Sequence, residues 1–124
     1  MLLDSNLIIY ATQPAYADLR TFIAQADPVV SAVSYVEVLG YHRLTDPDKH
    51  LLEAFFTAIE ILPIGEAVIQ SAIALRQQKR MSLGDALVAA TALTYKLTLL
   101  THNTQGFSWI DGLQVMDPFE GSNP

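Results

Sequence analysis

The sequence predicts an α/β fold in which helices cover both faces of a short-stranded, mainly parallel sheet. Two observations predict it. Short apolar segments alternate along the chain with longer segments of helical spacing, which is typical of parallel sheets buried between helices. The chain also has 124 residues, 51% of them hydrophobic, which suits one core. We therefore expect a single domain over residues 1–124, with a flexible tail at about 119–124.

The expected strands are short apolar segments that end at polar or turn-forming residues. They are Leu2–Leu3, 28–31, 61–64, 98–101 and 114–116. The first strand runs into Asp4, and the last one stops before Pro118. The first strand is the natural centre of such a sheet, so the residue that follows it lies close to the neighbouring strand ends.

Four helices are expected before residue 60, and turn-forming or helix-starting residues bound most of them. They span 6–11, 15–26, 32–42 and 46–59. Pro14 stops the first helix and Pro28 follows the second, because proline cannot continue a helix. Pro47 occupies the favoured first position of the fourth helix. The third helix carries Glu37 among apolar neighbours.

A fifth helix is expected over residues 66–80. Its helical spacing predicts that Ile69, Ala72 and Ile73 face the core. A cluster of cations lies near its end and is formed by Arg76, Lys79 and Arg80. Such residues balance the negative end of a helix, and they are also candidate contacts for phosphate groups or for an acidic segment of a partner.

The sixth helix, expected over residues 82–96, is the segment around which the rest is organised. Ser82 is a good N-cap, because its hydroxyl can accept a hydrogen bond from an amide of the first turn. The residues that follow are apolar almost all round, as in a helix buried on several sides. Asp85 falls in the first turn.

Composition excludes several classes of protein. The chain has no cysteine, which excludes disulfides and thiolate chemistry and suits the cytoplasm. No apolar run approaches the roughly 18–20 residues that span a bilayer, and the N-terminus lacks the features of a signal peptide. The net charge of −6 is opposite to that of a protein with a broad basic face for nucleic acid. A polyanion would therefore need a local patch or a metal ion.

Three acids fall where side chains of a parallel sheet converge. Asp4 ends the first strand, Glu37 lies about one turn into the helix after the second strand, and Asp85 begins the helix before the fourth strand. Thr101 and Asn103 end that fourth strand. Because the carboxyl ends of parallel strands share one edge of the sheet, we expect the acids to meet there.

A divalent cation would relieve the repulsion within such an acidic cluster. Uncompensated carboxylates at close range protonate in part. Oxygen ligands without cysteine favour Mg²⁺ or Mn²⁺ over zinc. One or two such ions can activate water and stabilise a leaving oxygen. The predicted chemistry is metal-assisted phosphodiester hydrolysis.

Each of these residues also has a purely structural interpretation. Asp4 could cap the short helix after it, Glu37 could lie on an exposed helix face, and Asp85 could balance the positive end of its helix. Asn103 could be an ordinary turn residue. His102 beside it fits a rim or packing position better than a general base.

Four motifs together resemble the PIN-domain family, most closely its small VapC-type toxins from bacterial toxin–antitoxin pairs. They are LLDSN at 2–6, SYVE at 34–37, SLGDALVAATA at 82–92 and LTHN at 100–103. Their order, their spacing and the chain length all fit, so the resemblance covers essentially the whole chain.

The resemblance implies a three-layer α/β/α fold and an endoribonuclease that depends on Mg²⁺ or Mn²⁺. It also implies a cognate antitoxin as partner and association into a homodimer. By position, Asp4, Glu37 and Asp85 match the family's acidic metal ligands. Thr101 matches a hydroxyl residue that often lines the site, and Asn6 matches a polar residue that supports the first acid.

The fourth acidic position of the family differs in this chain. Asn103 stands where many members carry an acid, and Gly106 stands where others carry an aspartate three residues later. Asn103 can still offer a carbonyl oxygen or hold a water. The pattern therefore predicts one metal ion more firmly than two.

The sequence fits other functions with acids at a sheet edge less well. A response-regulator receiver would need an aspartate after the strand at 61–64 and a lysine near 101–103, and both are missing. A phosphatase with an aspartate nucleophile would need a second aspartate where Asn6 stands. The alternative that persists is a catalytically weakened PIN-fold binding protein. Candidate association surfaces are the end of the third helix around Tyr41 and the Phe55–Phe56 face.

Overall fold

A parallel sheet of very short strands forms the centre of the molecule. The computed structural model describes residues 1–121. Its strands are β1 (Leu2–Leu3), β2 (Val30–Ser31), β3 (Ile61–Leu62), β4 (Leu99–Leu100) and β5 (Val115–Met116). All five lie within the predicted segments, and most are shorter than predicted.

The strands form two parallel groups, β1-β4-β5 and β2-β3, that are joined through β1. The Leu3 amide donates to the Val29 carbonyl over 2.9 Å, and the Val29 amide donates to the Met1 carbonyl over 2.9 Å. The order across the molecule is therefore β3-β2-β1-β4-β5. The prediction that the first strand is central is confirmed.

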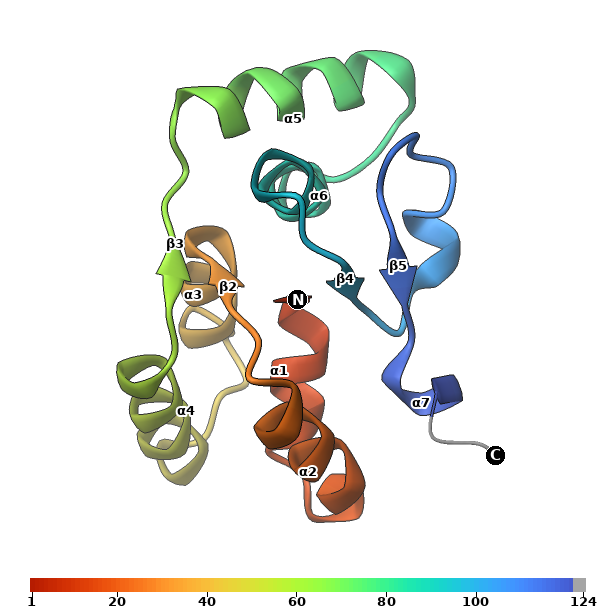
Figure 1. Cartoon of the computed structure of the whole chain (residues 1–124). Coiled ribbons are helices and arrows are strands. Elements are labelled where there is room, and N and C mark those ends of the chain that lie inside the picture. Colours follow the sequence, from red (N-terminus) through yellow and green to blue (C-terminus); the bar gives the residue numbers. More distant parts are fainter. Residues whose placement is uncertain (122–124) are drawn as a thin grey trace.

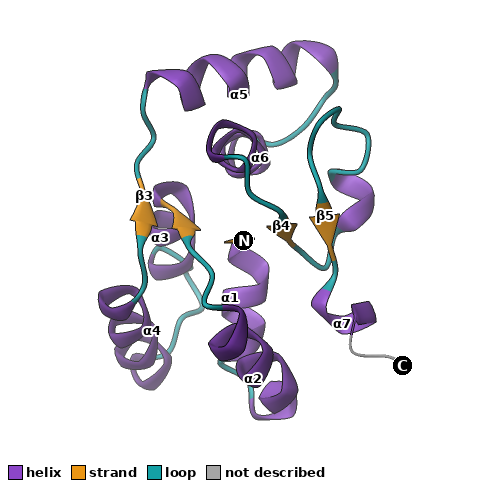
Figure 2. Ribbon diagram, in the orientation of Figure 1, coloured by secondary structure: helices purple, strands orange, loops and turns teal. Residues whose placement is uncertain are grey.

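Helices surround this sheet on both sides (Figure 1, Figure 2). They are α1 (Ser5–Ala11), α2 (Ala17–Ala26), α3 (Ala32–Leu39), α4 (Asp46–Ala58), α5 (Glu66–Gln78), α6 (Leu83–Tyr95) and α7 (Pro118–Gly121), with 3₁₀ turns η1 (Pro14–Tyr16) and η2 (Thr104–Gly106). In Figure 1, α5 and α6 lie above the strands, and α1, α2 and α4 lie below them. This is the predicted three-layer α/β/α arrangement. No helix within residues 1–121 is both long and apolar enough to cross a bilayer.

Two apolar cores, one on each face of the sheet, hold the layers together. Neighbouring strand residues point to opposite faces, so Leu2 packs with α5 and α6 while Leu3 packs with α1, α2 and α4. Both leucines are fully buried. This explains why the first strand has no polar residue on either face.

The helix α6 begins and ends as its sequence predicts. The Ser82 hydroxyl accepts a hydrogen bond from the Asp85 amide over 3.1 Å, which confirms the predicted N-cap. Lys96 ends the helix in the left-handed conformation, with φ 57°. Between them lies a run of buried side chains, formed by Ala86, Val88, Ala89, Ala90, Thr91 and Ala92.

Two helices end at least two residues earlier than predicted. The helix expected over 32–42 ends at Leu39, and a Cβ at Gly40 would lie 2.6 Å from the Val36 carbonyl oxygen. Only a residue without a side chain fits this close turn. The helix expected over 66–80 ends at Gln78, because Lys79 is already extended.

The predicted inward face of α5 is wrong in part. Ile69 and Ile73 are 44% and 47% exposed, whereas Ala72 is buried as predicted. The buried stripe runs through Val68, Ala72 and Leu75 instead. Both sets have helical spacing, and the packing of α5 against α6 decides between them.

The C-terminal segment forms a short helix within the described residues. Asp117 Oδ1 accepts from the Phe119 amide over 2.9 Å and so begins the turn of α7. The predicted flexible tail at about 119–124 therefore overlaps α7. Its last part, residues 122–124, lies outside the described residues.

Candidate functional site

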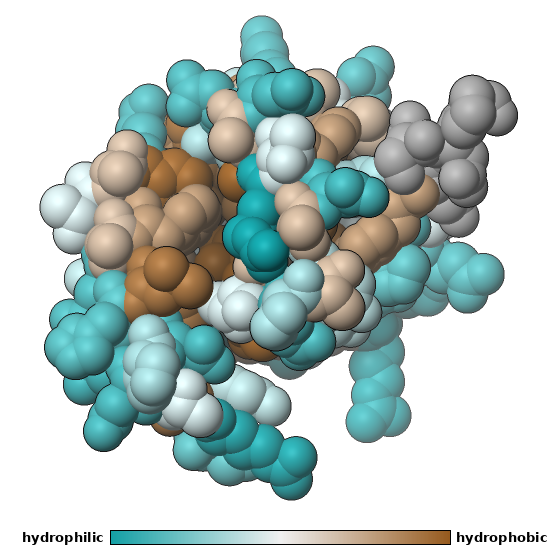
Figure 3. All heavy atoms as spheres, turned by 90° about the horizontal axis from the view of Figure 1, so that it is seen from below, coloured by the Kyte–Doolittle hydropathy of each residue, from teal (hydrophilic) through white to brown (hydrophobic). Residues whose placement is uncertain are grey.

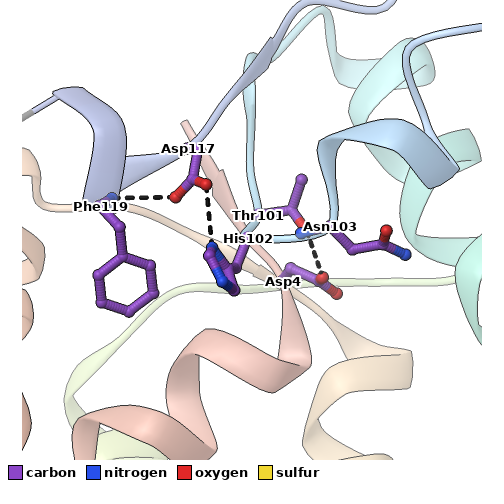
Figure 4. Close-up of polar contacts among 6 residues, drawn as sticks. All are labelled: Asp4, Thr101, His102, Asn103, Asp117 and Phe119. Atoms are coloured by element: carbon purple, nitrogen blue, oxygen red, sulfur yellow. Dashed lines mark hydrogen bonds and ion pairs between the residues drawn. The ribbon is translucent and has the colours of Figure 1, made fainter.

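Asp4 is the best-fixed acid of the candidate site. It follows β1 directly, caps α1 and is only 5% exposed. Its Oδ1 accepts from the Ser5 amide over 2.8 Å, and its Oδ2 accepts from the Thr101 hydroxyl over 2.7 Å (Figure 4). Two donors thus hold the carboxyl group in one orientation at the carboxyl edge of the sheet.

Thr101 connects Asp4 to the loop after β4. Its side chain is fully buried, and its oxygen accepts from the Asn103 amide over 3.1 Å. Because a hydroxyl has a single proton, this arrangement leaves that proton for Asp4. Thr101 thus lies beside Asp4, and its role in lining a functional site stays a prediction.

Glu37 reaches the site from α3. Its Oε1 accepts from the Ser5 hydroxyl over 2.7 Å, and that hydroxyl lies 2.9 Å from the hydroxyl of Ser34. On the other side, the carboxylate lies against Gly84 at the start of α6. A Cβ on Gly84 would stand 3.0 Å from Glu37 Cδ and closer still to Oε2. Glu37 is therefore seated between α1 and α6.

Asp85 follows Gly84 in the first turn of α6 and is half-buried. The Ser82 cap fixes its backbone through the Asp85 amide. Since Glu37 touches the preceding residue, the first turn of α6 brings Asp85 to the same edge of the sheet as Asp4 and Glu37.

The electrostatics of Asp4 connect the three acids. Burial, together with the charges of Asp85 and Glu37, raises the pKa of the Asp4 carboxyl to about 6, against the lowering effect of the hydrogen bonds from Thr101 and Ser5. Within the described residues, none of the three acids forms an ion pair. The cluster therefore carries negative charge that no side chain compensates.

The donor set of this cluster fits a hard divalent cation that keeps part of its water shell. All its ligand atoms would be carboxylate oxygens, and the chain has no cysteine. Among residues 1–121, no group of three or more acidic, histidine or cysteine side chains is arranged so that it could hold a metal ion. Magnesium does not require such a group, because it retains several waters and takes only one or two carboxylates.

Two of the predicted supporting residues lie elsewhere. Asn6 is exposed, and the hydrogen bonds that orient Asp4 come from Ser5 and Thr101 instead. The Asn103 side chain turns away from the Thr101–Asp4 hydrogen bond (Figure 4), and its Nδ2 would lie 2.6 Å from a Cβ on Gly106.

The neighbouring His102 also points away from Asp4. Its Nδ1 lies 2.9 Å from Oδ2 of the buried Asp117, and its ring packs edge-on against Phe119 (Figure 4). This agrees with the predicted rim or packing role. The contact fixes the loop after β4 to the end of β5.

The three predicted cations lie beside the site rather than in it. Arg76, Lys79 and Arg80 line a hollow of about 760 Å³ between α5 and the start of α6. Its other walls are mainly apolar and include Ile73 and Leu83. Arg76 is held there by a hydrogen bond from its Nε to the Met81 carbonyl, over 3.3 Å.

Sequence reasoning missed three residues that shape the site, namely Ser5, Ser34 and Gly84. Ser34 precedes Glu37 by three positions, so both lie on one face of α3. All three residues also stand within the motifs at 2–6, 34–37 and 82–92, which was a further signal. The contacts of Ser5 and Gly84 with Glu37 depend on how α1, α3 and α6 approach one another.

Known proteins resemble this chain over nearly its full length. Ribonuclease VapC1 of Rickettsia felis is 28% identical over 94% of each chain. The tRNA(fMet)-specific endonuclease VapC of Shigella flexneri is 27% identical, over 94% of this chain and 96% of the relative. Among solved structures, a toxin–antitoxin complex from Klebsiella pneumoniae superimposes with a TM-score of 0.74 at 26% identity, covering 94% of this chain and 96% of that chain.

The family assignment rests on a match over most of the chain. Residues 1–113 match the PIN domain family, a span that includes Asp4, Glu37, Asp85 and the loop after β4. The protein therefore belongs to the PIN domain family.

Proposed function

We propose that this protein is a metal-dependent endoribonuclease, the toxin of a VapBC-type toxin–antitoxin pair, and that it hydrolyses RNA phosphodiester bonds. The observation that carries the proposal is the buried Asp4 carboxyl, whose pKa is raised by burial and by the charges of Asp85 and Glu37. Strongly perturbed carboxyl groups cluster at functional sites. Relatives named as VapC ribonucleases support the same activity.

Asp4, Glu37 and Asp85 are the proposed ligands of Mg²⁺, with Mn²⁺ as a substitute. When bound, the ion supplies a Lewis acid that activates water and stabilises the leaving oxygen of the phosphodiester. Thr101 and the Ser5 amide hold Asp4 by donating to both of its oxygens, and these bonds favour the charged form that binds a cation. The absence of an acid at both Asn103 and Gly106 supports one ion rather than two.

An apolar groove supports a protein partner. It lies between α1, α2 and α4, and Figure 3 shows apolar side chains gathered in a hollow on the face that these helices form. One part encloses about 350 Å³ and is lined by Ile8, Ile23, Leu52 and Phe55, among others. Because this lining is almost wholly apolar, it suits a protein segment better than RNA. We propose that the cognate antitoxin binds there; the similar structure from Klebsiella pneumoniae is itself a toxin–antitoxin complex.

Two further surfaces belong to the proposal. Tyr35, Val36 and Tyr41 are 43%, 71% and 38% exposed at the end of α3, and they support association into a homodimer. Arg76, Lys79 and Arg80 beside α6 are proposed to contact RNA phosphates or an acidic segment of the antitoxin. Because RNA is the proposed substrate, we place the activity in the cytoplasm.

A cleavage assay tests the activity. Purified native protein and the Asp4→Asn variant are incubated with total RNA and Mg²⁺, and the products are mapped. The proposal predicts cleavage by the native protein and a loss of at least about 100-fold in the variant, because removing one charged ligand disrupts the cation site. Equal cutting by both proteins would point to a contaminating nuclease.

The alternative is a PIN-fold binding protein with weakened catalysis. The absence of a fourth acid at Asn103, and the turn of its amide away from Asp4, favour this alternative. It predicts that the native protein binds RNA or a protein partner yet leaves RNA intact when Mg²⁺ or Mn²⁺ is added.

A further inference from the structure

We propose that Ser5 is a positioning residue that keeps the Glu37 carboxylate beside Asp4 and Asp85. This inference rests on the proposed function, since it explains how a cation site of three acids is assembled. Ser5 itself touches neither substrate nor metal in this account. It acts through Glu37.

Ser5 contacts two of the acids at once. Its backbone amide donates to Asp4 Oδ1 over 2.8 Å, and its hydroxyl donates to Glu37 Oε1 over 2.7 Å. Asp4 follows β1 and Glu37 lies on α3, so a single residue at the start of α1 joins two elements of the site. A substitution that removes only the hydroxyl leaves the amide contact with Asp4 in place.

The direction of the hydrogen bonds follows from the proton count. The Ser5 hydroxyl has one proton, and the Glu37 carboxylate can only accept. That proton therefore goes to Glu37, and the Ser34 hydroxyl lies within hydrogen-bond distance of the Ser5 oxygen, at 2.9 Å. Ser34 is fully buried and Ser5 is 7% exposed. The result is a short ordered chain that runs from Ser34 through Ser5 to Glu37.

Glu37 needs this support because its neighbours repel it. Glu37 is an exposed residue of α3, and a long glutamate side chain has many rotamers at such a position. The carboxylates of Asp4 and Asp85 favour those rotamers that point into solvent. The hydrogen bond from the Ser5 hydroxyl holds the Glu37 carboxylate in the site against this repulsion. Gly84 allows the close approach of this carboxylate, since a Cβ there would stand 3.0 Å from Glu37 Cδ.

Loss of the Ser5 hydroxyl should therefore release Glu37 and weaken the cation site. Residues that orient metal ligands commonly account for 10–100-fold in metal affinity or activity, and we expect an effect of about that size. Asp4 should keep its position, because its two donors are the Ser5 amide and Thr101.

The test compares Ser5→Ala in two backgrounds, native and Glu37→Ala, by calorimetric titration with Mn²⁺. If Ser5 acts through Glu37, Ser5→Ala raises the Kd for Mn²⁺ by about 10–100-fold in the native background and changes it little when Glu37 is already absent. Ser71→Ala, a serine on α5 outside the site, serves as the matched control. An equal loss in both backgrounds would overturn the inference.

A second measurement requires no metal. A crystal structure of metal-free Ser5→Ala should show the Glu37 carboxylate displaced from Gly84, and a carboxylate still seated there would reject the positioning role. If Ser5→Ala does not fold, Gly84→Ala tests the position of the Glu37 carboxylate, because a side chain at residue 84 would displace it. This variant should weaken Mn²⁺ binding by a similar factor in the native background only.

The two proposals fail in different ways. Native Mn²⁺ affinity in Ser5→Ala, together with RNA cleavage by the native protein, would reject the role of Ser5 and leave the nuclease intact. A native protein that neither binds Mn²⁺ nor cuts RNA would reject the proposed function, and the role of Ser5 toward the metal with it.

Discussion

The Asp4 carboxyl is buried at the edge of the core, although its proposed role requires a charge. Burial and two nearby carboxylates raise its pKa to about 6 from 3.8, while the hydrogen bonds from Thr101 and Ser5 lower it in part. In the metal-free protein at neutral pH, ionised Asp4 therefore destabilises the fold by about 3 kcal/mol. A bound cation would offset this destabilisation.

This energetic relation predicts how the stability of the metal-free protein depends on pH. The folded state binds the Asp4 proton more tightly than the unfolded chain does, so the stability from this group is complete below about pH 4 and is lost as the pH rises through about 6. Urea unfolding between pH 4 and 7.5 should show a decrease of about 1–3 kcal/mol.

The Asp4→Asn variant is the control for this pH dependence. It keeps the shape of the side chain and removes the titrating group, so the decrease through this window should become smaller. A native protein whose stability rises steadily from pH 4 to 7.5, in parallel with the variant, would contradict the assignment.

At the scale of single residues, the sequence predicted correctly where a side chain lies when its residue directly follows a strand. Asp4 and Thr101 each follow a strand, and the edge of a parallel sheet brings such residues together. Asn6 was assigned a supporting role that Ser5 has instead. The hydrogen bond from Ser5 to Glu37 forms only because α3 packs beside α1, and α3 lies about thirty residues away in sequence. No local sequence pattern indicates that these two helices are in contact.

At the scale of helices and strands, the sequence predicted the position of α5 but not which of its faces is buried. Its periodicity gave the correct spacing, but it did not distinguish the stripe through Val68 from the neighbouring one through Ile69. Val68 is 1% exposed, and Ile69 is 44% exposed. Because α5 packs mainly on one side against α6, only a narrow stripe is buried, and a rotation of one residue exchanges it for its neighbour.

A pair of substitutions measures this difference. Val68→Ala should lower the free energy of unfolding by about 1–3 kcal/mol, because it opens space in the core. Ile69→Ala should change it by only about 0.5 kcal/mol, as is usual for exposed positions. Urea unfolding at one pH gives both values. A larger effect at Ile69 would contradict the observed orientation of α5.

The ends of the elements were predicted less well than their presence. The third helix stops at Gly40, where the Val36 carbonyl leaves no room for a Cβ. The sequence shows the glycine, yet a single glycine within a helical pattern is often tolerated. The close backbone approach that makes it a stop becomes visible only in three dimensions.

At the scale of the whole molecule, the order β3-β2-β1-β4-β5 explains why the site forms at one edge. The central β1 presents Asp4 between the ends of β2 and β4, while α3 and α6 add Glu37 and Asp85. Alternating apolar and helical segments were sufficient to predict this class of fold. They could not predict the apolar groove between α1, α2 and α4, because side chains from three separate helices form it.

That groove yields a prediction about the partner. Ala54 is exposed and lines it, so Ala54→Asp should place a charge in the apolar surface and weaken antitoxin binding by 10-fold or more, at about 1.4 kcal/mol per tenfold. Gln70→Asp, at an exposed position of α5, is the control. The measurement is co-purification with an antitoxin sought in the neighbouring reading frame, and unchanged recovery with Ala54→Asp would place the partner elsewhere.

The central claim is that Asp4, Glu37 and Asp85 form one site for a hard divalent cation. Calorimetric titration with Mn²⁺ of the native protein, Asp4→Asn and Asp85→Asn tests it most directly. The account predicts saturable uptake by the native protein at about one ion per chain, and binding at least about 10-fold weaker in each variant. Absence of uptake by the native protein, even with a phosphodiester ligand present, or equal affinity in all three proteins would contradict it.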